Sequence, residues 1–305
     1  MASDPRRSLH RMAWAGLVGA FLLVLAGGLV TSRDAGLAVP DWPLAFGSLN
    51  PPGWWQMENV RTEHSHRILA FLVASWTGFL LLVVLRRETS VLVRRFAITA
   101  AALVIVQALL GGLRVLELSV DLAMIHGVVG QLFLASLAAV VAVTSPSWER
   151  ASAVPETRRE RVQSAVLLGA VAAQLLLGLF IRHLGPSARP LSGTPLLYAH
   201  VIGAGVVLCA LLDLQRDCGA RCAPGGRLLL PLVSLQIALG IAAYVTTDDM
   251  TFDRQATILE AWLPTLHVGA GAALLATVVV RNLHAWRSVL VDTASAPHGA
   301  FGRVL

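Results

Sequence analysis

The sequence predicts an all-α membrane protein with eight transmembrane helices, arranged as two pseudo-repeated four-helix bundles. Of its 305 residues, 56% are hydrophobic and 14% are charged, and the mean hydropathy is +0.69. Such values are typical of chains that lie mostly within a bilayer. A membrane-spanning helix needs about 20 predominantly apolar residues, and eight stretches of this kind occur in the chain. Because eight divides into four and four, the two halves are expected to run in the same direction through the membrane.

The spans follow one another with little chain between them. They are predicted at residues 12–31, 64–85, 95–113, 121–144, 163–182, 195–213, 226–246 and 261–281. The first stretch could be a signal peptide, but seven more follow it, so we interpret it as an uncleaved first helix. The polar stretch from Ser145 to Arg161 separates the fourth span from the fifth. It predicts two domains, residues 1–150 and residues 151–305.

The longest predicted connection runs from Thr31 to Thr62 and is rich in proline, glycine and tryptophan. It is too long for a simple connector. Its tryptophans are of a type that favours the membrane interface. We therefore expect it to form a lid over a site at the outer face.

The basic residues predict the orientation. All 24 are arginine. If the N-terminus is cytoplasmic, 17 of them fall in cytoplasmic segments and 7 in outer segments, as the positive-inside rule requires. We expect a bacterial cell membrane, both termini in the cytoplasm, and a net charge of +6 that reflects topology, not nucleic-acid binding. Cys209, Cys218 and Cys222 are expected to be inert or reduced thiols.

A short pattern supports an internal duplication. Gln-x-x-x-Gly occurs at Gln107–Gly111, Gln174–Gly178 and Gln236–Gly240, within the third, fifth and seventh spans. Chance in a chain rich in Ala, Gly and Leu is the alternative for any single match. Three matches on odd-numbered spans favour duplication.

Four histidines occupy matching depths near the outer ends of the even-numbered spans. They are His66, His126, His200 and His267. An ionisable side chain is costly in a bilayer, and paired imidazoles on facing helices hold heme iron in membrane bundles. The pattern therefore predicts two iron sites, one in each half. Packing or hydrogen bonding is the alternative for any one histidine alone.

The residue four positions after each histidine is small, and it lies on the same helix face as the histidine. These residues are Ala70, Gly130, Ala204 and Gly271. We interpret them as space for a flat macrocycle beside the imidazole.

The two halves differ at one carboxylate. Glu63 lies three residues before His66, whereas the corresponding positions before His200 and His267 are Leu197 and Pro264. A partly desolvated carboxylate can transfer a proton during oxidation of a substrate. An acid in the first turn also stabilises a helix, and position alone leaves both roles open.

Four arginines at the outer ends of the spans could pair with heme propionates, which arginine binds well. They are Arg33, Arg67, Arg114 and Arg182. A plain interfacial arginine is the alternative for each.

The combined motifs resemble those of one family. Glu63-His-Ser-His66-Arg67 resembles the Glu-x-x-His-Arg motif of heme A synthases. The segments Gly27–Gly36, Asp41–Pro43 and Pro51–Gly53 are similar to that family's first span and following loop. Many bacterial members carry a cysteine pair in an outer loop, and this sequence has none there.

The resemblance implies a function for each half. The first half would bind the substrate, heme o, between His66 and His126, with Glu63 as the acid/base residue. The second half would hold a heme b cofactor on His200 and His267. The enzyme would oxidise the C8 methyl group of heme o to a formyl group by successive hydroxylations with oxygen from water. The product would be heme a for cytochrome oxidase, and the electrons would pass to heme b.

Candidate partners are membrane lipid, the heme o synthase (a farnesyltransferase), cytochrome oxidase assembly factors and a second copy of the chain. Two other functions stay open. One is a two-heme membrane cytochrome that only relays electrons, which has no use for Glu63. The other is a heme carrier or chaperone, which binds heme without turnover.

Overall fold

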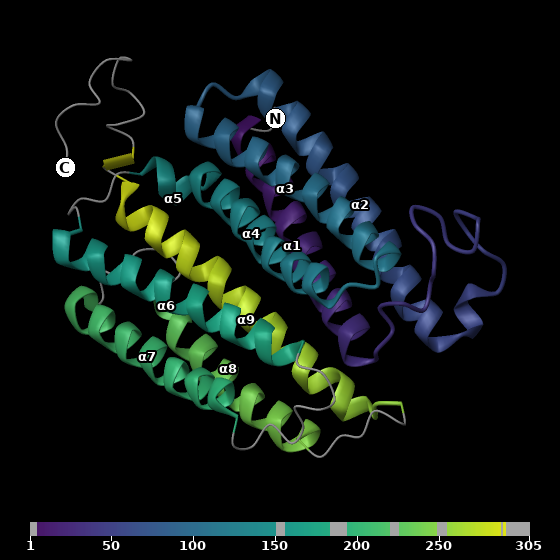
Figure 1. Ribbon diagram of the computed structural model, residues 1–305. Coiled ribbons are helices and arrows are strands. Elements are labelled where there is room, and N and C mark those ends of the chain that lie inside the picture. Colours follow the sequence, from purple (N-terminus) through teal and green to yellow (C-terminus); the bar gives the residue numbers. More distant parts are fainter. Residues whose placement is uncertain are drawn as a thin grey trace.

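The computed structural model describes residues 5–150, 156–183, 194–219, 226–248, 255–287 and 289–290. Within these ranges the chain is built from long helices, and the only β pairing is an isolated bridge between Ala45 and Ser48 (Figure 1). The elements are α1 (Pro5–Ser32), η1 (Trp54–Gln56), α2 (Glu58–Arg87), α3 (Val91–Leu116), α4 (Val120–Thr144), α5 (Pro146–Glu149), α6 (Arg158–Arg182), α7 (Pro195–Cys218), α8 (Gly226–Thr247) and α9 (Ile258–Ala285).

Eight of these helices are long and apolar enough to cross a membrane, which confirms the predicted all-α class and the predicted spans. Most helices extend beyond their apolar stretch because polar residues form their ends. In α6 and α9, Thr157 and Thr257 each form a capping box with the glutamate three residues later. Such a box satisfies two backbone N–H groups that would otherwise be unpaired at the helix start.

The helices pack in the same cyclic order in both halves. In the first half, α1 contacts α2, α2 contacts α3, α3 contacts α4, and α4 returns to α1. In the second half, α6, α7, α8 and α9 repeat this order. The two groups lie side by side in Figure 1, where α9 contacts α1 and α4, and α6 contacts α4. This arrangement agrees with two pseudo-repeated bundles. Residues 151–155, at the predicted domain boundary, lie outside the described residues.

Small residues let the two halves approach closely. The C-terminal half of α4 is buried nearly all round and is rich in alanine and valine. A Cβ atom on Gly28 of α1 would lie 3.3 Å from Cγ2 of Thr265 in α9, and one on Gly127 of α4 would lie 2.8 Å from Cδ2 of Leu179 in α6. Close backbone approach of this kind is how helices associate where lipid surrounds them.

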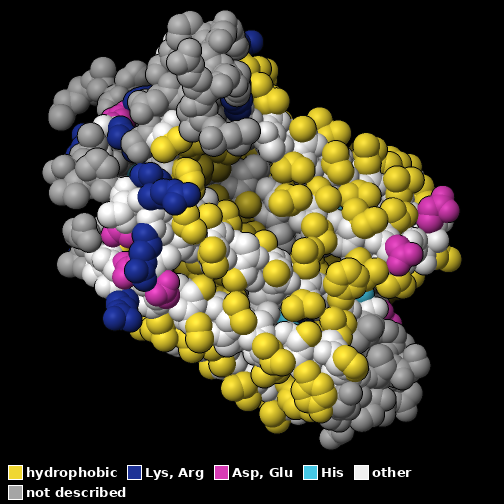
Figure 2. Space-filling model, turned by 60° about the vertical axis from the view of Figure 1, so that its left-hand side comes forward, with side chains coloured by type: hydrophobic (Ala, Val, Ile, Leu, Met, Phe, Trp, Pro, Cys, Tyr) yellow, Lys and Arg dark blue, Asp and Glu magenta, His cyan; other side chains and the backbone are white. Residues whose placement is uncertain are grey.

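The surface carries a broad band of hydrophobic side chains, with arginines gathered towards one side of the view (Figure 2). Exposed apolar residues include Phe71 in α2 and Val245 in α8, each 72% exposed. A continuous exposed band suits contact with lipid. Because eight spans alternate in direction, α1 begins and α9 ends at the same end of the bundle (Figure 1). The opposite end carries His66, His126, His200 and His267, and we call it the histidine end.

At the end opposite the histidines, the side chain of Arg281 is fully buried in α9 and donates to Oε2 of Glu156 at 2.8 Å. This ion pair ties the segment before α6 to the last span. Cys218, at the end of α7, is disulfide-bonded, so the expectation of a reduced thiol is wrong for this residue. Cys222 lies outside the described residues.

Candidate functional site

Each of the four histidines points at a glycine on a neighbouring helix of its own half. The contacts are His66 on Gly27 of α1, His126 on Gly111 of α3, His200 on Gly178 of α6 and His267 on Gly240 of α8. A Cβ atom on the first three glycines would lie 3.2 Å from the ring's Cε1 atom, and on Gly240 it would lie 2.8 Å away. The rings therefore face the interior of each half.

His200 and His267 form a close pair between α7 and α9. Their ring centroids are 6.2 Å apart and their planes are inclined by 71°. Two metal–nitrogen bonds of about 2 Å each, plus the offset of each nitrogen from its ring centre, would put the centres of two imidazoles that share one metal ion roughly 6 Å apart. The separation therefore suits one metal ion between the two rings.

The tautomer of His267 also suits a ligand. Its Nδ1 atom lies 3.0 Å from the backbone carbonyl oxygen of Gln236. This carbonyl can only accept a hydrogen bond, so Nδ1 carries the proton and Nε2 keeps a lone pair. A bond from the second ring nitrogen to a carbonyl is the usual way in which a metal-ligating histidine is oriented.

His66 and His126 form the corresponding pair of the first half, from α2 and α4. They lie close enough for a charge on one ring to act on the other. Nδ1 of each is buried and, among the described residues, has no hydrogen-bond partner. Buried polar atoms without partners are uncommon in folded proteins and call for a functional explanation.

These donor sets fit a heme iron. A porphyrin supplies the equatorial ligands, so the protein needs to give only two axial ones. A structural zinc site, by contrast, uses four protein ligands. The part of the chain that the structure describes has no group of three or more His, Cys, Asp or Glu side chains that could hold a metal ion.

The space beside the histidines is filled differently from our expectation. Cβ atoms on Gly130 and Gly271 would lie 3.0 and 3.1 Å from Nε2 of Gln107 and Gln236. The interpretation of these small residues as room for a macrocycle is therefore wrong at both positions, because a glutamine amide from the neighbouring helix occupies the space. In α7, Gly203 faces the side chain of Gln174.

Glu63 is buried beneath the outer loop, with 3% of its surface exposed. Its Oε2 atom accepts a hydrogen bond from the backbone N–H of Val39 at 2.9 Å. Its Oε1 atom accepts from Nε and Nη2 of Arg67 at 3.1 and 2.5 Å. The carboxylate is thus held one helical turn from His66 by the loop on one side and an arginine on the other.

Arg67 fastens the loop to α2. Besides Glu63, it donates to three loop carbonyl oxygens, those of Val39 at 3.0 Å, Asp41 at 2.6 Å and Leu44 at 3.1 Å. All five N–H groups of the guanidinium are engaged. As a propionate partner Arg67 stays a prediction, and that role would require it to release part of the loop.

The loop is itself ordered by Asp41, whose carboxylate accepts from the backbone N–H groups of Phe46 at 2.6 Å and Gly47 at 2.7 Å. The N–H of Gly47, with that of Phe46, holds the pKa of Asp41 below its usual range, because these donors favour the ionised form. The ring of Trp42 packs directly over Gly112 of α3, beside the glycine that receives His126. The loop therefore covers the histidine end of the first half, as a lid would.

The other three arginines also lie at the histidine end. Arg33 pairs with Oε1 of Glu58 at 2.7 Å. Arg114 donates from Nη2 to the carbonyl oxygen of Gly36, and Arg182 donates from Nη2 to the carbonyl oxygen of Gly28 and to Oγ of Ser32. Within the described residues, Nε and Nη1 of Arg114 and Arg182 make no hydrogen bond, so these two are the better placed to meet an anionic group.

The sequence interpretation missed two features. His64, two residues before His66, is buried and contacts the ring of Trp54 at a centroid distance of 4.8 Å. The Gln-x-x-x-Gly pattern, read only as a trace of duplication, supplies both the glycine that receives a ring and a glutamine beside it. Its four-residue spacing, equal to that between each histidine and its small residue, was the available signal.

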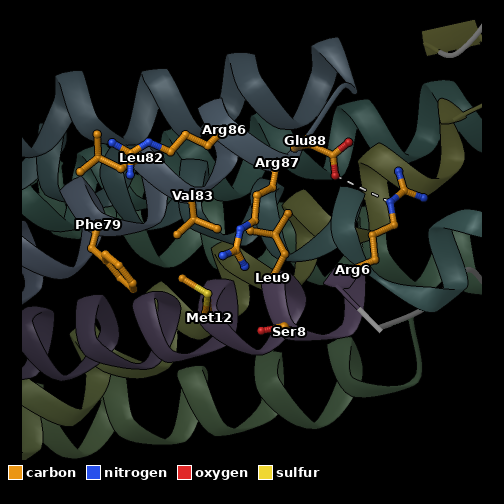
Figure 3. Close-up of a pocket in the computed structure, with 10 residues that line it drawn as sticks. All are labelled: Arg6, Ser8, Leu9, Met12, Phe79, Leu82, Val83, Arg86, Arg87 and Glu88. Carbon is orange, nitrogen blue, oxygen red and sulfur yellow. Dashed lines mark ion pairs between the residues drawn. The ribbon is translucent and has the colours of Figure 1, made fainter. Parts of the chain in front are cut away.

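One hollow lies far from the histidines. It measures about 280 Å³ and lies between the start of α1 and the end of α2, where Arg6 and Glu88 pair at 3.7 Å (Figure 3). Arg86, which lines it, is 20 residues along α2 from His66, a distance of about 30 Å in a helix. This hollow is not part of the histidine site.

Comparison with known proteins agrees with this geometry. The family model described as cytochrome oxidase assembly protein matches residues 1–140. The chain is 28% identical over 265 residues to the heme A synthase of Symbiobacterium thermophilum, covering 77% of this chain and 85% of that protein. It is 32% identical over 129 residues to the heme A synthase of a Chelativorans species, covering 39% and 36% of the two chains. It is 38% identical over 123 residues to that of Azorhizobium caulinodans, covering 36% and 35%.

The matches to the last two relatives therefore span about a third of each protein, whereas the first spans most of its length. Helix number and histidine placement agree with these similarities, which are to heme A synthases in all three relatives.

Proposed function

We propose that this protein is a heme A synthase, which oxidises the C8 methyl group of heme o to a formyl group in the bacterial cell membrane. The observation that carries the proposal is the pairing of imidazoles in both halves, with a buried carboxylate, Glu63, beside only one pair. Two equivalent pairs would suit electron transfer alone. A carboxylate at one of them suits a reaction that releases protons there.

The first half is the proposed substrate site. His66 and His126 would hold the iron of heme o, and the loop from Arg33 to Met57 would cover it. Among the residues that the structure describes, some N–H groups of Arg114 have no partner, and they lie near both histidines and the loop. Arg114 is the proposed propionate partner. The lid would also exclude bulk water, which protects a partly oxidised substrate from side reactions.

The second half is the proposed cofactor site, where His200 and His267 would hold heme b with their Nε2 atoms. When bound, heme b supplies one-electron redox chemistry that can carry electrons away from the substrate. Arg182, which lies near His267, would pair with a propionate. The bond from Nδ1 of His267 to Gln236 fixes the ring for this role.

The overall reaction balances as follows. The methyl group and one water give the formyl group, four protons and four electrons. It proceeds through an alcohol and a geminal diol, which loses water. Glu63 is the proposed first acceptor of these protons at a carboxylate oxygen, and Arg67 holds that carboxylate in place. The electrons pass by way of the second half to an acceptor in the membrane.

Pigment extraction from the purified protein tests the proposal. We expect heme b in near-stoichiometric amount, and heme o or heme a in smaller, exchangeable amount. His200→Ala should lose heme b. Production of heme a in a host that makes heme o but lacks its own synthase is the activity test. A protein that carries two permanently bound b hemes and makes no heme a would be an electron relay, and the proposal would be wrong.

A further inference from the structure

Three of the four histidines are locked to the neighbouring helix by a glutamine. In α3, Nε2 of Gln107 donates to the backbone carbonyl oxygen of His126 at 2.6 Å. In α6, Nε2 of Gln174 donates to that of His200 at 2.7 Å. In α8, Gln236 contacts Nε2 of His267 with its side chain at 3.3 Å and Nδ1 with its backbone oxygen at 3.0 Å.

Each of the two helices in such a pair gives one side chain to a glycine of the other. The glycine four residues after each glutamine receives the imidazole, and a glycine three or four residues after each histidine receives the amide. The backbone carbonyls of Gln107 and Gln174 also face the rings of His126 and His200, although they fall short of a full hydrogen bond with Nδ1. Two antiparallel helices with the same spacing of four thus fix each other's register and the direction of the ring.

His66 is the exception. It rests on Gly27 of α1, and the residue four positions before Gly27 is Leu23. Leucine has no donor for the carbonyl oxygen of His66. Nδ1 of His66 has no hydrogen-bond partner within the described residues, and in this it does not differ from Nδ1 of His126 and His200. The second half therefore has a glutamine at both of its histidines, and the first half has one only at His126.

We propose that Gln107, Gln174 and Gln236 are positioning residues for the heme ligands, the first two through their side-chain amides and Gln236 through its backbone carbonyl on Nδ1 of His267. We propose also that Leu23 leaves His66 as the ligand that is released. This inference rests on the proposed function, which makes the histidines heme ligands. A ligand whose orientation is fixed by neighbours binds metal more tightly, typically by 10–100-fold. The half with two glutamines would keep its heme, and the half with one would let substrate enter and product leave.

The test uses the full-length protein in detergent. Gln174→Met removes the amide donor to the backbone carbonyl oxygen of His200 and nearly keeps the volume. We expect the heme b dissociation rate, measured by transfer to apomyoglobin, to rise about tenfold or more. We also expect the low-spin ferric EPR signal, which depends on the angle between the axial ring planes, to shift from that of wild type. Loss of packing alone would not move that signal.

Leu23→Gln is the converse variant. It should slow the exchange of heme o in the first half and leave the heme b signal unchanged. Gln131→Met in α4 is the matched control, because the Oε1 atom of Gln131 is buried without a partner and, within the described residues, its side chain makes no hydrogen bond to a histidine. We expect wild-type exchange and EPR in this control.

The outcomes distinguish a failure of the positioning role from a failure of the heme-ligand assignment. If His200→Ala loses heme b but Gln174→Met keeps the wild-type dissociation rate and EPR signal, the positioning role is wrong and the proposed function stands. If His200→Ala retains heme b with an unchanged spectrum, the ligand assignment itself fails.

Discussion

Arg67→Met is the perturbation that tests how the loop and Glu63 are held. The side chain of Arg67 is 18% exposed and that of Glu63 is 4% exposed, so water cannot readily replace the lost partner. Removing one member of a buried ion pair destabilises a protein by about 3–5 kcal/mol, because the other charge is left buried and unpaired. We expect a loss within this range, since Oε2 of Glu63 would keep only the bond from Val39.

The assay is a double-mutant cycle. The free energy of unfolding in detergent is measured for wild type, Arg67→Met, Glu63→Gln and the double variant. Neutral glutamine leaves no buried charge, so the double variant should be less destabilised than the sum of the single variants, by roughly 1–3 kcal/mol. Protease cleavage within residues 33–57 should also be faster in Arg67→Met, because three loop carbonyl groups lose their common donor.

Additive single variants, or an Arg67→Met protein within about 0.5 kcal/mol of wild type, would refute this reasoning. In that case the ion pair would contribute little, and the loop would be held by its apolar contacts. The small cluster of Val39, Ala45 and Val60, with Trp54 packed against it, would then be the structure that keeps the lid closed.

Three further predictions follow from the same geometry. Glu63→Ala should keep heme b and stop formation of the formyl group, which pigment analysis measures; full activity would remove Glu63 from the mechanism. Gly240→Ala should displace His267 and lower heme b content severalfold, because its Cβ atom would lie 2.8 Å from the ring, whereas Gly169→Ala in α6, which has open space, should match wild type. Loop N–H groups lower the pKa of Asp41, so its carboxylate stabilises the loop above the ordinary aspartate pKa of about 3.9 and loses this effect as the pH falls through the lower folded value. The difference in unfolding temperature between wild type and Asp41→Asn should therefore shrink on acidification, and a constant difference would contradict the assignment.

The spans were predictable because a bilayer imposes a length and an apolar composition that each segment shows by itself. The ends of the helices were less predictable, because polar capping residues such as Thr157 and Thr257 extend the helices beyond the apolar stretch. The histidines stood out because ionisable residues are rare in such helices. Whether they hold heme stays a prediction.

Contacts between distant segments could not be predicted. Val39 meets Glu63 across 24 residues, and Trp42 meets Gly112 of α3. Neither pair has a local spacing that predicts the contact, because both depend on how the loop folds over the bundle. The small residues after the histidines indicated close approach by another group. They could not indicate that this group is a glutamine of the next helix.

The two halves differ most where α1 contacts α2 at the histidine end, and we call this contact a corner of the bundle. At this corner the chain has Leu23, Glu63, Arg67 and the covering loop. The equivalent corner between α6 and α7 has Gln174, Leu197 and Val201. Under the proposed function, changes at this one corner would turn one of two similar heme sites into a reaction site. The changes are a proton acceptor, an arginine that holds it, a lid, and a ligand free to be released. The pair on α7 and α9, which has none of these but has both glutamines, is suited to keeping a heme in place. Under the proposed function, the two halves therefore have different tasks, and neither half could replace the other.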